Sequence, residues 1–531
     1  MPKQPLGAQI SQMLKDRGVD TIFGIPGVHN VELYRGIEQA GITHVLARHE
    51  QGAGFMADGY ARASGKPGVA YVITGPGLTN IMTPMGQAYS DSVPMLVISS
   101  CLDETAAQRG QLHQMRDQRA AAETVCAWSE EARTADAAYA LIDRAFDQFN
   151  SARGRPCHLQ VSISTLGAVA EPAPLPAVQR PKAPAARHHD VYALVEAVLS
   201  AQKPLFVFGG GAVAGAGAIP DLLRQTGAAS FVTYAGRGVV PHDQPLFFGS
   251  TLARPDSAGI IAQADLVVAV GTTLSEVDLW RPTLGHTAPL MRVDIDPECF
   301  TGLGPDDTAI LADAGEVLRA MAISIPARTD DQPPKWDAAK VGQQKAIWRA
   351  EIASERPGIV PVCDALKAIL PDTTMIYSDM TQFAYGAKEV WDMPKPGHWH
   401  HPYGFGTLGY ALPAAIGGAV ARPGLPTMAI AGDYGLQYTI QELGTAVELG
   451  LPLPILVWDN GKLGEIEDSM VRSQIAPNAV VARNPDFLAL ARAHGAGAVE
   501  PTTLDALQSA VTDALQAKGP TLIRMTRALA G

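Results

Sequence analysis

The sequence predicts an α/β fold built from three doubly wound parallel-sheet domains. Short apolar runs rich in Val and Ile alternate with stretches of helical periodicity along the chain, which is the pattern of parallel sheets covered by helices on both faces. The length of 531 residues exceeds what one ordinary hydrophobic core serves, and three domains of common size fit it. With 47% hydrophobic and 18% charged residues, the composition is that of an ordered globular protein.

Two stretches interrupt this alternation of strand-like and helix-like segments, and we predict that they are linkers. The first, residues 171–186, is rich in Pro and Ala, and the second, residues 325–334, ends in DDQPP. Both compositions disfavour helices and strands. We therefore predict an N-terminal domain over residues 1–170, a middle domain over residues 188–322 and a C-terminal domain over residues 340–531.

Charge and cysteine content argue against several classes of protein. The net charge is −12 and no run of Lys and Arg occurs, so we expect no nucleic-acid partner. Five widely spaced cysteines without CxxC pairing predict reduced core residues rather than a disulfide framework or a zinc site. The N-terminal segment lacks the apolar core of an export signal and no uncharged run reaches membrane-spanning length, so we expect a cytoplasmic location without a membrane partner.

The middle domain contains a glycine-rich turn, PLFVFGGGAVAGAG, in which Gly209, Gly210, Gly211 and Gly215 follow an apolar run. This turn partly matches a dinucleotide-binding fingerprint. The next predicted strand, SFVTYAGRG, lacks the acidic residue that would hold a ribose, and such turns are common for packing reasons alone. We therefore expect neither NAD nor FAD as a cofactor, and a simple nucleotide-binding module is disfavoured for the same reason.

The strongest chemical signal is the segment AIAGDYGLQYTIQELGTAVELGLPLPILVWDNGKLGEIED in the C-terminal domain. One apolar strand delivers Asp433 to a turn, a helix follows, and a second apolar strand delivers Asp459 and Asn460 to its carboxyl end. In a right-handed parallel crossover both strand ends lie at one edge of the sheet, where ligands of open α/β sheets bind. A carboxylate, an amide oxygen and a backbone carbonyl near Lys462 suit Mg²⁺ bridging a diphosphate. Alternatively, Asp433 is simply a helix cap.

This segment resembles the motif, beginning GDG and ending NN, of the thiamine diphosphate-dependent superfamily of acetolactate synthases and 2-oxo acid decarboxylases. The resemblance covers nearly the whole chain. Tyr434 replaces the third motif glycine and Asp459 the first asparagine, and both changes leave Asp433 and Asn460 in place. The resemblance implies thiamine diphosphate and Mg²⁺ as cofactors, with Asp433, Asn460 and Lys462 as metal ligands. The expected cofactor contacts are Glu50, Gln382, Gly406, Leu408, Gly432, Asp433, Tyr434, Gly435, Asn460 and Lys462.

Glu50, in RHEQGAGFMADGYARASGKPGVAYVITGPGLTN, is the expected acid–base residue. It follows a short apolar strand and opens a helix of small residues, where a carboxyl group is poorly solvated. In the family the matching glutamate hydrogen-bonds N1′ of the aminopyrimidine ring, and proton exchange there lets N4′ remove the proton from thiazolium C2. The alternative is an acidic residue that stabilises a helix N-terminus.

Further site residues follow from the resemblance. Leu408 in YGFGTLGYALPAAIG stands where the family wedges a side chain between the two cofactor rings, and the Gly406 carbonyl would accept a hydrogen bond from N4′. Thr74 begins the glycine-rich turn TGPGLTN beside the substrate. His113 in QLHQM is a candidate catalytic proton relay, and Gln382 in DMTQFAYG is a candidate phosphate contact. Taken singly, each also fits a core residue, a tight turn or a surface side chain.

Within the superfamily, the segments GIPGVHNVELYRG, LHQMRDQRA, SDMTQFAYG and NPDF make the chain most similar to the 5-guanidino-2-oxopentanoate decarboxylases. The resemblance implies a lyase that decarboxylates a 2-oxo acid non-oxidatively to an aldehyde. Glu465, Glu467 and Asp468 follow the metal loop in a segment that lines the substrate channel in relatives, and carboxylates there suit a cationic substrate tail. Glu465 is the predicted substrate contact, whereas Glu467 and Asp468 also fit a solvated helix start.

Two other functions stay open. After decarboxylation the remaining carbon unit either takes up a proton and leaves as an aldehyde, or attacks a second carbonyl compound, as in an acetolactate synthase-like carboligase. A non-catalytic cofactor-binding relative is the other alternative, but it would have little chemical reason to keep Glu50. Because family members bind the cofactor between the N-terminal domain of one chain and the C-terminal domain of another, we expect a homodimer at minimum and a homotetramer by resemblance.

Overall fold

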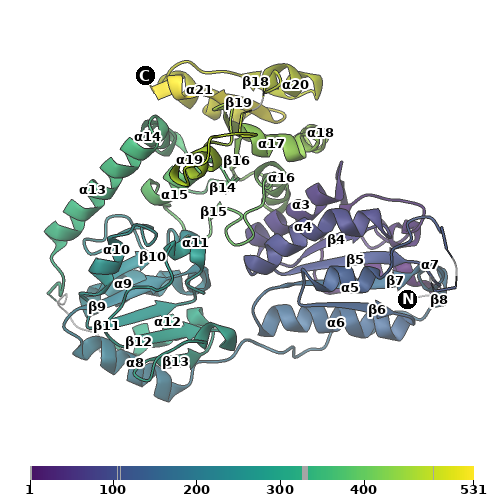
Figure 1. Cartoon of the computed structure of the whole chain (residues 1–531). Helices are drawn as coiled ribbons and strands as arrows, with labels where there is room; N and C mark the ends of the chain where they lie inside the picture. Colours follow the sequence, from purple (N-terminus) through teal and green to yellow (C-terminus); the bar gives the residue numbers. More distant parts are fainter. Residues whose placement is uncertain (1–2, 105, 108, 326–332, 482, 531) are drawn as a thin grey trace.

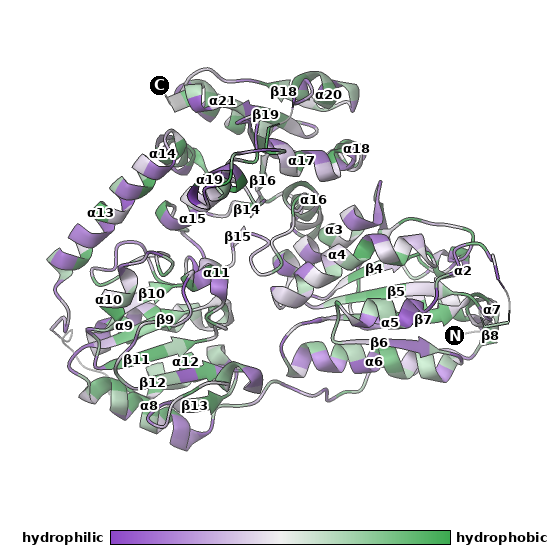
Figure 2. Cartoon of the chain, viewed as in Figure 1, coloured by the Kyte–Doolittle hydropathy of each residue, from purple (hydrophilic) through white to green (hydrophobic). Residues whose placement is uncertain are grey.

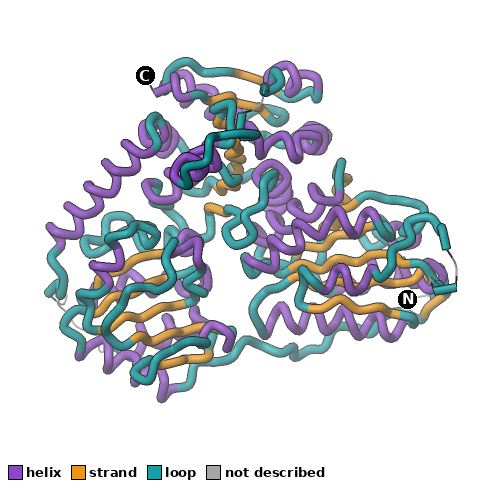
Figure 3. The backbone as a smooth tube through the Cα atoms, viewed as in Figure 1, coloured by secondary structure: helices purple, strands orange, loops and turns teal. Residues whose placement is uncertain are grey.

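The computed structural model describes residues 3–104, 106–107, 109–325, 333–481 and 483–530. The chain forms three lobes, each built around one parallel sheet with helices on its faces (Figure 1, Figure 3). This arrangement confirms the predicted fold class. The central strands are apolar and buried, whereas the outer helix α13 (Ala338–Glu355) carries both hydrophilic and hydrophobic residues (Figure 2). Most of the predicted second linker, residues 326–332, lies outside the described residues.

The sheet of the N-terminal lobe has the strand order β3-β2-β4-β5-β7-β6. Its strands are β2 (Thr21–Gly24), β3 (Thr43–Leu46), β4 (Gly68–Val72), β5 (Met95–Cys101), β6 (Trp128–Ala132) and β7 (Pro156–Ser162). Its helices are α1 (Leu6–Asp16), α2 (Val31–Tyr34), α3 (Glu50–Ser64), α4 (Pro76–Ser90), α5 (Gln118–Glu123), α6 (Ala135–Ser151) and α7 (Ile163–Gly167). A short antiparallel pair, β1 (Gln4–Pro5) and β8 (Val169–Ala170), joins the two ends of this lobe.

The middle lobe has the strand order β10-β9-β11-β12-β13. Its strands are β9 (Pro204–Phe208), β10 (Ala229–Val232), β11 (Leu266–Val270), β12 (Leu290–Asp294) and β13 (Thr308–Leu311). Its helices are α8 (His188–Ser200), α9 (Ile219–Thr226), α10 (Ser257–Ile261), α11 (Glu276–Leu279) and α12 (Ala314–Ser324), with 3-10 helices η1 (Gly210–Ala218), η2 (Tyr234–Gly236) and η3 (Pro297–Phe300). A Cβ at Gly209 would lie 2.3 Å from the Gly271 carbonyl oxygen, so close packing alone explains a glycine at this position of the turn.

The C-terminal lobe has the strand order β15-β14-β16-β17-β19-β18 and is reached through α13 (Figure 1). Its strands are β14 (Met375–Ser378), β15 (Trp399–His400), β16 (Thr427–Gly432), β17 (Pro454–Trp458), β18 (Gly497–Val499) and β19 (Thr521–Met525). Its further helices are α14 (Ile359–Ile369), α15 (Gln382–Val390), α16 (Ala411–Ala421), α17 (Asp433–Thr439), η4 (Ile440–Glu442), α18 (Leu443–Glu448), α19 (Gly464–Arg472), α20 (Phe487–Ala493), α21 (Leu504–Ala514) and η5 (Arg527–Ala530).

Helices α3 and α16 join the N-terminal and C-terminal lobes. Their backbones touch because glycines stand at the contacts: a Cβ at Gly59 would lie 2.0 Å from the Ala414 carbonyl oxygen. A Cβ at Gly417 would lie 1.9 Å from the carbonyl oxygen of Met56. Residue numbers rise along one helix while they fall along the other, so the two helices are antiparallel. This contact fixes how the two lobes of one chain sit together.

The remaining sequence expectations concern cysteines and membranes. All five cysteines are free, and every one except Cys299 is buried. Burial raises the pKa of Cys101 and of Cys126 to about 12, so these thiols stay protonated and unreactive at neutral pH. Across the part of the chain that the structure describes, no helix is long and apolar enough to cross a membrane.

Candidate active site

The predicted strand–helix–strand unit is present in the C-terminal lobe. β16 and β17 are parallel neighbours, and their register pairs Gly432 with Trp458. Asp433 and Asp459 are the next residues along the two strands, so both carboxylates leave the sheet at the same edge. Asn460 follows one residue later, and Asp433 begins α17. The sheet edge thus brings the two predicted metal-binding side chains into one region.

Asn484 bridges the two carboxylates. Its Nδ2 donates to Asp433 Oδ2 at 2.7 Å and to Asp459 Oδ1 at 2.9 Å. Arg524 Nε donates to Asp459 Oδ2 at 2.7 Å and pairs with that carboxylate. Burial raises the pKa of Asp433, and the neighbouring charge of Asp459 adds to the effect. Because a cation beside Asp433 would offset both effects, this carboxylate fits a bound Mg²⁺.

A metal ion at Asp433 requires oxygen ligands beyond side-chain carboxylates. In the described ranges, no group of three or more His, Cys, Asp and Glu side chains is placed to hold a metal ion. Asn460 Oδ1 accepts a hydrogen bond from Lys462 N at 3.2 Å, so the amide oxygen faces the turn that contains Lys462. Amide and carbonyl oxygens, water and phosphate complete the ligand set that Mg²⁺ prefers.

Gln382 lies against the same turn. It begins α15, and its Oε1 accepts a hydrogen bond from Asn460 Nδ2 at 3.0 Å. Its Nε2 donates to Asp468 Oδ2 at 3.4 Å. The structure therefore brings together Gln382, Asn460 and Lys462, which the sequence predicted as cofactor contacts. Their assignment to the cofactor stays a prediction.

The acidic segment Glu465, Glu467 and Asp468 lies at the start of α19. Glu465 Oε1 pairs with Arg356 Nε at 3.3 Å, and Glu467 pairs with Lys462 Nζ. The Glu465 side chain keeps 29% of its surface exposed, so a ligand can reach it. The Glu465 carboxylate is therefore already paired with Arg356. A cationic group that bound to Glu465 would interact with the same carboxylate as Arg356.

The turn that contains Gly406 and Leu408 lies beside the strand ends. Gly406 has a positive φ of 66°, a conformation that favours glycine, and Leu408 is half-buried. Gly409 N donates to Asp379 Oδ2 at 2.8 Å, and a Cβ at Gly435 would lie 2.5 Å from the same oxygen. Burial raises the pKa of Asp379 to about 7. One buried carboxyl group thus lies against both the Leu408 turn and the first turn of α17.

Glu50 lies in the N-terminal lobe as the first residue of α3, as predicted. The residue is 9% exposed, and its Oε2 accepts a hydrogen bond from Asn80 Nδ2 at 2.9 Å. A Cβ at Gly77 would lie 3.3 Å from Glu50 Oε1, so the glycine-rich turn approaches the carboxyl group closely. The Thr74 hydroxyl is buried and lies 2.9 Å from Ser100 Oγ. The structure therefore groups Glu50 with the predicted turn.

His113 forms a pair with a histidine that the sequence patterns did not single out. The rings of His29 and His113 lie edge to face with centroids 4.8 Å apart. Their Nδ1 atoms are buried and have no hydrogen-bond partner. Burial lowers the pKa of His29, and the neighbouring His113 adds to this. The His113 carbonyl oxygen lies 2.4 Å from the Cβ position of Gly75, so the pair lies beside the glycine-rich turn.

The two groups of site residues lie apart within one chain. The antiparallel register of α3 and α16 places Ala411, the first residue of α16, opposite the region of Arg62, near the end of α3. Glu50, at the start of α3, is twelve residues earlier, which corresponds to about 18 Å along the helix axis. The turn with Leu408 directly precedes α16. The start of α16 and Glu50 therefore lie toward opposite ends of α3 within one chain.

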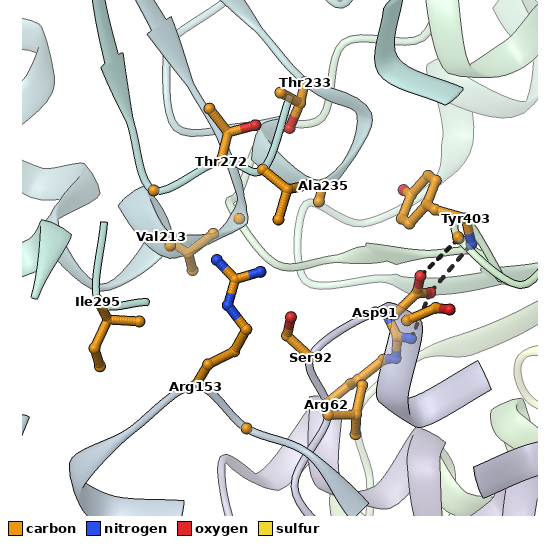
Figure 4. A pocket seen from close by; sticks show the side chains of 18 of the residues that line it. Arg62, Asp91, Ser92, Arg153, Val213, Thr233, Ala235, Thr272, Ile295 and Tyr403 are labelled. Atoms are coloured by element: carbon orange, nitrogen blue, oxygen red, sulfur yellow. Dashed lines mark hydrogen bonds and ion pairs between the residues drawn. The ribbon is translucent and has the colours of Figure 1, made fainter. Parts of the chain in front are cut away.

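A cavity of about 500 Å³ lies where the three lobes meet (Figure 4). Arg62 and Asp91 of the N-terminal lobe, Thr233 and Thr272 of the middle lobe, and Tyr403 of the C-terminal lobe line it. Arg62 Nη2 pairs with Asp91 Oδ2 at 2.9 Å, and Tyr403 N donates to the same oxygen at 3.1 Å. The cavity contacts none of the predicted catalytic, cofactor or metal residues, so it is distinct from the candidate active site.

Several residues that contact the predicted site residues were not themselves predicted. Asn80, Asp379 and Asn484 occur inside the motifs TGPGLTN, SDMTQFAYG and NPDF, which held a signal for them. Glu442 lies inside the segment that begins AIAGDYG, but the sequence does not show its contact, because its partner Arg48 lies 394 positions earlier. Such a contact depends on how the lobes pack and leaves no local pattern.

Models of one family match three parts of the chain. The N-terminal TPP binding domain of the thiamine pyrophosphate enzymes matches residues 5–121, their central domain matches residues 191–321, and their C-terminal TPP binding domain matches residues 379–525. The chain therefore belongs to the thiamine pyrophosphate enzymes, as predicted, and thiamine diphosphate is the cofactor that this family binds.

Individual relatives resemble the chain over its whole length. A probable 2-ketoarginine decarboxylase of Pseudomonas aeruginosa is 42% identical over 539 residues, which cover 100% of this chain and 96% of the relative. The large subunit of acetolactate synthase isozyme 2 of Escherichia coli is 28% identical, with 98% and 95% covered. The mitochondrial acetolactate synthase catalytic subunit of Saccharomyces cerevisiae is 27% identical, with 98% and 80% covered.

Proposed function

We propose that this protein decarboxylates 5-guanidino-2-oxopentanoate, also called 2-ketoarginine, with thiamine diphosphate and Mg²⁺. The observation that carries the proposal is the 42% identity to a probable 2-ketoarginine decarboxylase over the entire chain. The broader class predicted from the sequence, a thiamine diphosphate-dependent 2-oxo acid decarboxylase, is confirmed by that relative together with the three family matches. The substrate and the metal are our proposals.

Asp433 and Asn460 would hold Mg²⁺ against the diphosphate of the cofactor. Their oxygens leave one sheet edge, and Asp433 is a buried carboxylate that gains from a neighbouring cation. When bound, thiamine diphosphate supplies the carbon nucleophile that attacks the 2-oxo group and the electron sink for the bond that releases CO₂. Gly406 and Leu408 would contact the rings of the cofactor at the other end of the site.

Glu50 would exchange a proton with the pyrimidine N1′ atom. Its carboxyl group is largely buried, and Asn80 fixes one oxygen by donating a hydrogen bond at 2.9 Å. The second oxygen, Oε1, remains to face the ring. A positioned acid of this kind typically contributes ~10²–10⁴-fold to the rate.

His113 would deliver the proton that completes the aldehyde. The ring nitrogen Nδ1 is buried without a hydrogen-bond partner, and the residue lies beside the turn that Glu50 approaches. In a carboligase this proton is not needed at that stage, because a second carbonyl compound reacts instead. The acetolactate synthases among the relatives make carboligation the alternative outcome to test.

The complete site would form between two chains. Within one chain, α3 separates Glu50 from the level of Ala411, the start of α16, by roughly 18 Å along its axis, and the Leu408 turn directly precedes Ala411. A second copy can supply the missing half, with the N-terminal lobe of one chain facing the C-terminal lobe of the other. We therefore propose a homodimer as the smallest active unit and a homotetramer as the assembled enzyme.

The substrate proposal is tested by comparing two 2-oxo acids on two proteins. A guanidinium tail gains a charge-assisted hydrogen bond at Glu465, worth roughly 1.5–3 kcal/mol, which corresponds to about a tenfold to hundredfold preference over pyruvate. Arg356 already shares this carboxylate, so we expect the lower end of that range. Glu465→Gln should reduce kcat/KM for 5-guanidino-2-oxopentanoate and leave the value for pyruvate unchanged.

The products decide between the two functions. Chromatography of the reaction mixture should show the aldehyde and CO₂ in equal amounts from the guanidino substrate. A matched control is Glu38→Gln, which changes an exposed glutamate of the N-terminal lobe and should affect neither substrate. Pyruvate as the preferred substrate, with acetolactate as its product, would rule out the decarboxylase proposal in favour of a carboligase.

A further inference from the structure

We infer that Glu442 is a positioning residue for Glu50. This carboxylate belongs to the C-terminal lobe but binds the peptide groups that directly precede α3 in the N-terminal lobe. It thereby holds the start of α3, and Glu50 with it, in a fixed place. The inference rests on the proposed role of Glu50 in proton exchange.

The hydrogen bonds of Glu442 converge on the residues before Glu50. Arg48 N donates to Oε1 and Oε2 of Glu442 at 3.0 and 3.1 Å, and His49 N donates to Oε1 at 3.0 Å. Thr445 Oγ1 donates to Oε2 at 2.8 Å and orients the carboxylate from its own lobe. Two consecutive peptide groups are therefore fixed by one side chain, and the next residue is Glu50.

Glu442 is fully buried where the two lobes meet. Gly52 provides the space, because a Cβ there would lie 2.2 Å from Glu442 Oε1. Burial raises the pKa of Glu442 to about 7, and the hydroxyl of Thr445 and the backbone N–H groups of Arg48 and His49 limit this rise. Without such hydrogen-bond donors, the ionised form of a buried carboxyl group would be strongly disfavoured.

The backbone N–H groups that face residue 442 require a hydrogen-bond acceptor there. The two peptide N–H groups can only donate, and the Glu442 oxygens that face them accept both hydrogen bonds. A glutamine of the same size would turn an NH₂ group toward one of these donors. Glu442→Gln therefore disturbs the start of α3 without changing the volume, whereas Glu442→Asp keeps the charge on a shorter side chain.

Asn80 and Glu442 hold Glu50 from two sides. Asn80 fixes the carboxyl group through Oε2, and Glu442 fixes the backbone through Arg48 and His49. Loss of the second anchor lets the carboxyl group move relative to the pyrimidine ring. A displacement of about 1 Å at a reacting group costs on the order of 10²-fold in rate.

The test uses five full-length variants besides the wild type: Glu442→Gln, Glu442→Asp, Glu50→Gln, the double variant of Glu50→Gln with Glu442→Gln, and Tyr377→Phe. Tyr377 Oη donates to Gly59 O at 2.8 Å, so Tyr377→Phe removes another buried hydrogen bond between α3 and the C-terminal lobe, away from Glu50. Deuterium exchange at C2 of bound thiamine diphosphate, steady-state kcat and KM, and amide hydrogen exchange of residues 46–56 in the cofactor-free protein are measured for each protein.

The expected pattern separates positioning from general stability. Glu442→Gln should slow C2 exchange and lower kcat by about 10²-fold with little change in KM, and Glu442→Asp should recover most of the loss. The double variant should be no slower than Glu50→Gln, because Glu442 acts through Glu50. Amide exchange of residues 46–56 should accelerate in Glu442→Gln and stay unchanged in Tyr377→Phe.

Other outcomes overturn the inference and remain distinguishable. Wild-type C2 exchange in Glu442→Gln, with slow exchange in Glu50→Gln, overturns the inference alone. Wild-type exchange in Glu50→Gln overturns the role of Glu50 and the inference with it. If the rate loss of the double variant equals the product of the losses in the two single variants, Glu442 has a purely structural role. Should Glu442→Gln fail to fold, Thr445→Val takes its place, and unchanged amide exchange of residues 46–56 in that variant overturns the inference.

Discussion

At the scale of single residues, Asp459 adds a second carboxylate to the edge of the sheet at which we propose the metal binds. The family motif has asparagine at this position, and here a carboxylate stands beside Asp433 at the ends of neighbouring strands. Arg524 pairs with Asp459, and Asn484 donates to both carboxylates through the same amide group. The pairing with Arg524 leaves Asp433 as the carboxylate without an ionic partner among the described residues at this edge, and this is the one that the motif assigns to the metal.

Replacement of Asp433 tests the metal assignment. Asp433→Ala should abolish retention of thiamine diphosphate and the dependence on Mg²⁺ together, because the ion links the protein to the diphosphate. Calorimetric titration with the cofactor at several Mg²⁺ concentrations measures both effects. Asp459→Asn is the matched control: it restores the residue of the motif and should keep both properties. Wild-type binding by Asp433→Ala would contradict the assignment.

The residue scale also marks the limit of what local sequence can predict. Glu50, Asp433 and Asn460 were predicted because each stands in a motif at the end of a strand or the start of a helix. Their partners were not: Asn484 lies 25 positions after Asp459, and Glu442 lies 394 positions after Arg48. These partners are set by how loops and lobes pack, so no local periodicity marks them.

At the scale of elements, the contact between α3 and α16 relies on the absence of side chains. At Gly59 and Gly417 the two backbones are so close that a Cβ atom on either residue would clash with the other helix. The same residue type has the opposite role in α13, where Gly342 is exposed and nothing lies within 4 Å of its Cβ position. The two environments predict opposite effects of one substitution.

Gly417→Ala should destabilise the protein, whereas Gly342→Ala should stabilise it. The new methyl group at Gly417 would meet the Met56 carbonyl oxygen at 1.9 Å and force the helices apart, which typically costs about 1–3 kcal/mol. At Gly342 it meets no atom and only improves helix propensity, a gain of up to about 1 kcal/mol. Urea unfolding followed by circular dichroism measures both values. Equal effects at the two positions would contradict this account of the helix contact.

A buried histidine in β7 makes the stability of the N-terminal lobe depend on pH. His158 Nε2 lies 2.8 Å from Ser99 Oγ and Nδ1 lies 2.7 Å from Ser129 Oγ, and burial lowers the pKa of His158 to about 3. Between that value and the unfolded pKa of 6.5, only the unfolded chain takes up the proton. Stability from this group is therefore complete above pH 6.5 and is lost as the pH falls toward 3.

His158→Gln should remove part of this pH dependence. For a single group with these pKa values, the loss between pH 7.5 and pH 5 is about 2 kcal/mol. Thermal unfolding of the cofactor-free protein at both pH values measures it in the wild type and the variant. His189→Gln, at an exposed position, is the control and should leave the dependence unchanged. An identical pH dependence in His158→Gln and the wild type would show that His158 does not contribute.

At the scale of the whole molecule, the three sheets and the family were predictable from apolar runs and motifs, whereas a site shared between two chains was expected only from the family resemblance and stays a proposal. Apolar runs such as MLVISSC in β5 and TMAIAG in β16 identify buried parallel strands, because both faces of such strands are covered. Nothing in these patterns tells whether Glu50 meets the Leu408 turn of its own chain. The register of α3 on α16 bears on this question, since it places Ala411, three residues after Leu408, opposite Arg62 and so toward the end of α3 remote from Glu50.

Mixing two inactive variants tests whether the site forms between chains. In a hybrid dimer of one Glu50→Gln chain and one Asp433→Ala chain, one of the two composite sites combines an intact Glu50 with an intact Asp433. Co-expression of the two variants with different affinity tags should therefore restore up to about half of the wild-type activity per hybrid dimer. Sites formed within single chains would all carry one defect, so an inactive purified hybrid would contradict the proposal.

The separation of Glu50 from the Leu408 turn also has a consequence for how the enzyme responds to its own concentration. If neither chain contains a complete active site, dissociation of the dimer inactivates both sites at once, and the monomer has no activity. Specific activity should then fall steeply on dilution, as the square of the chain concentration governs the amount of dimer. Cellular abundance would thus set not only how much enzyme is present but also which fraction of it can work.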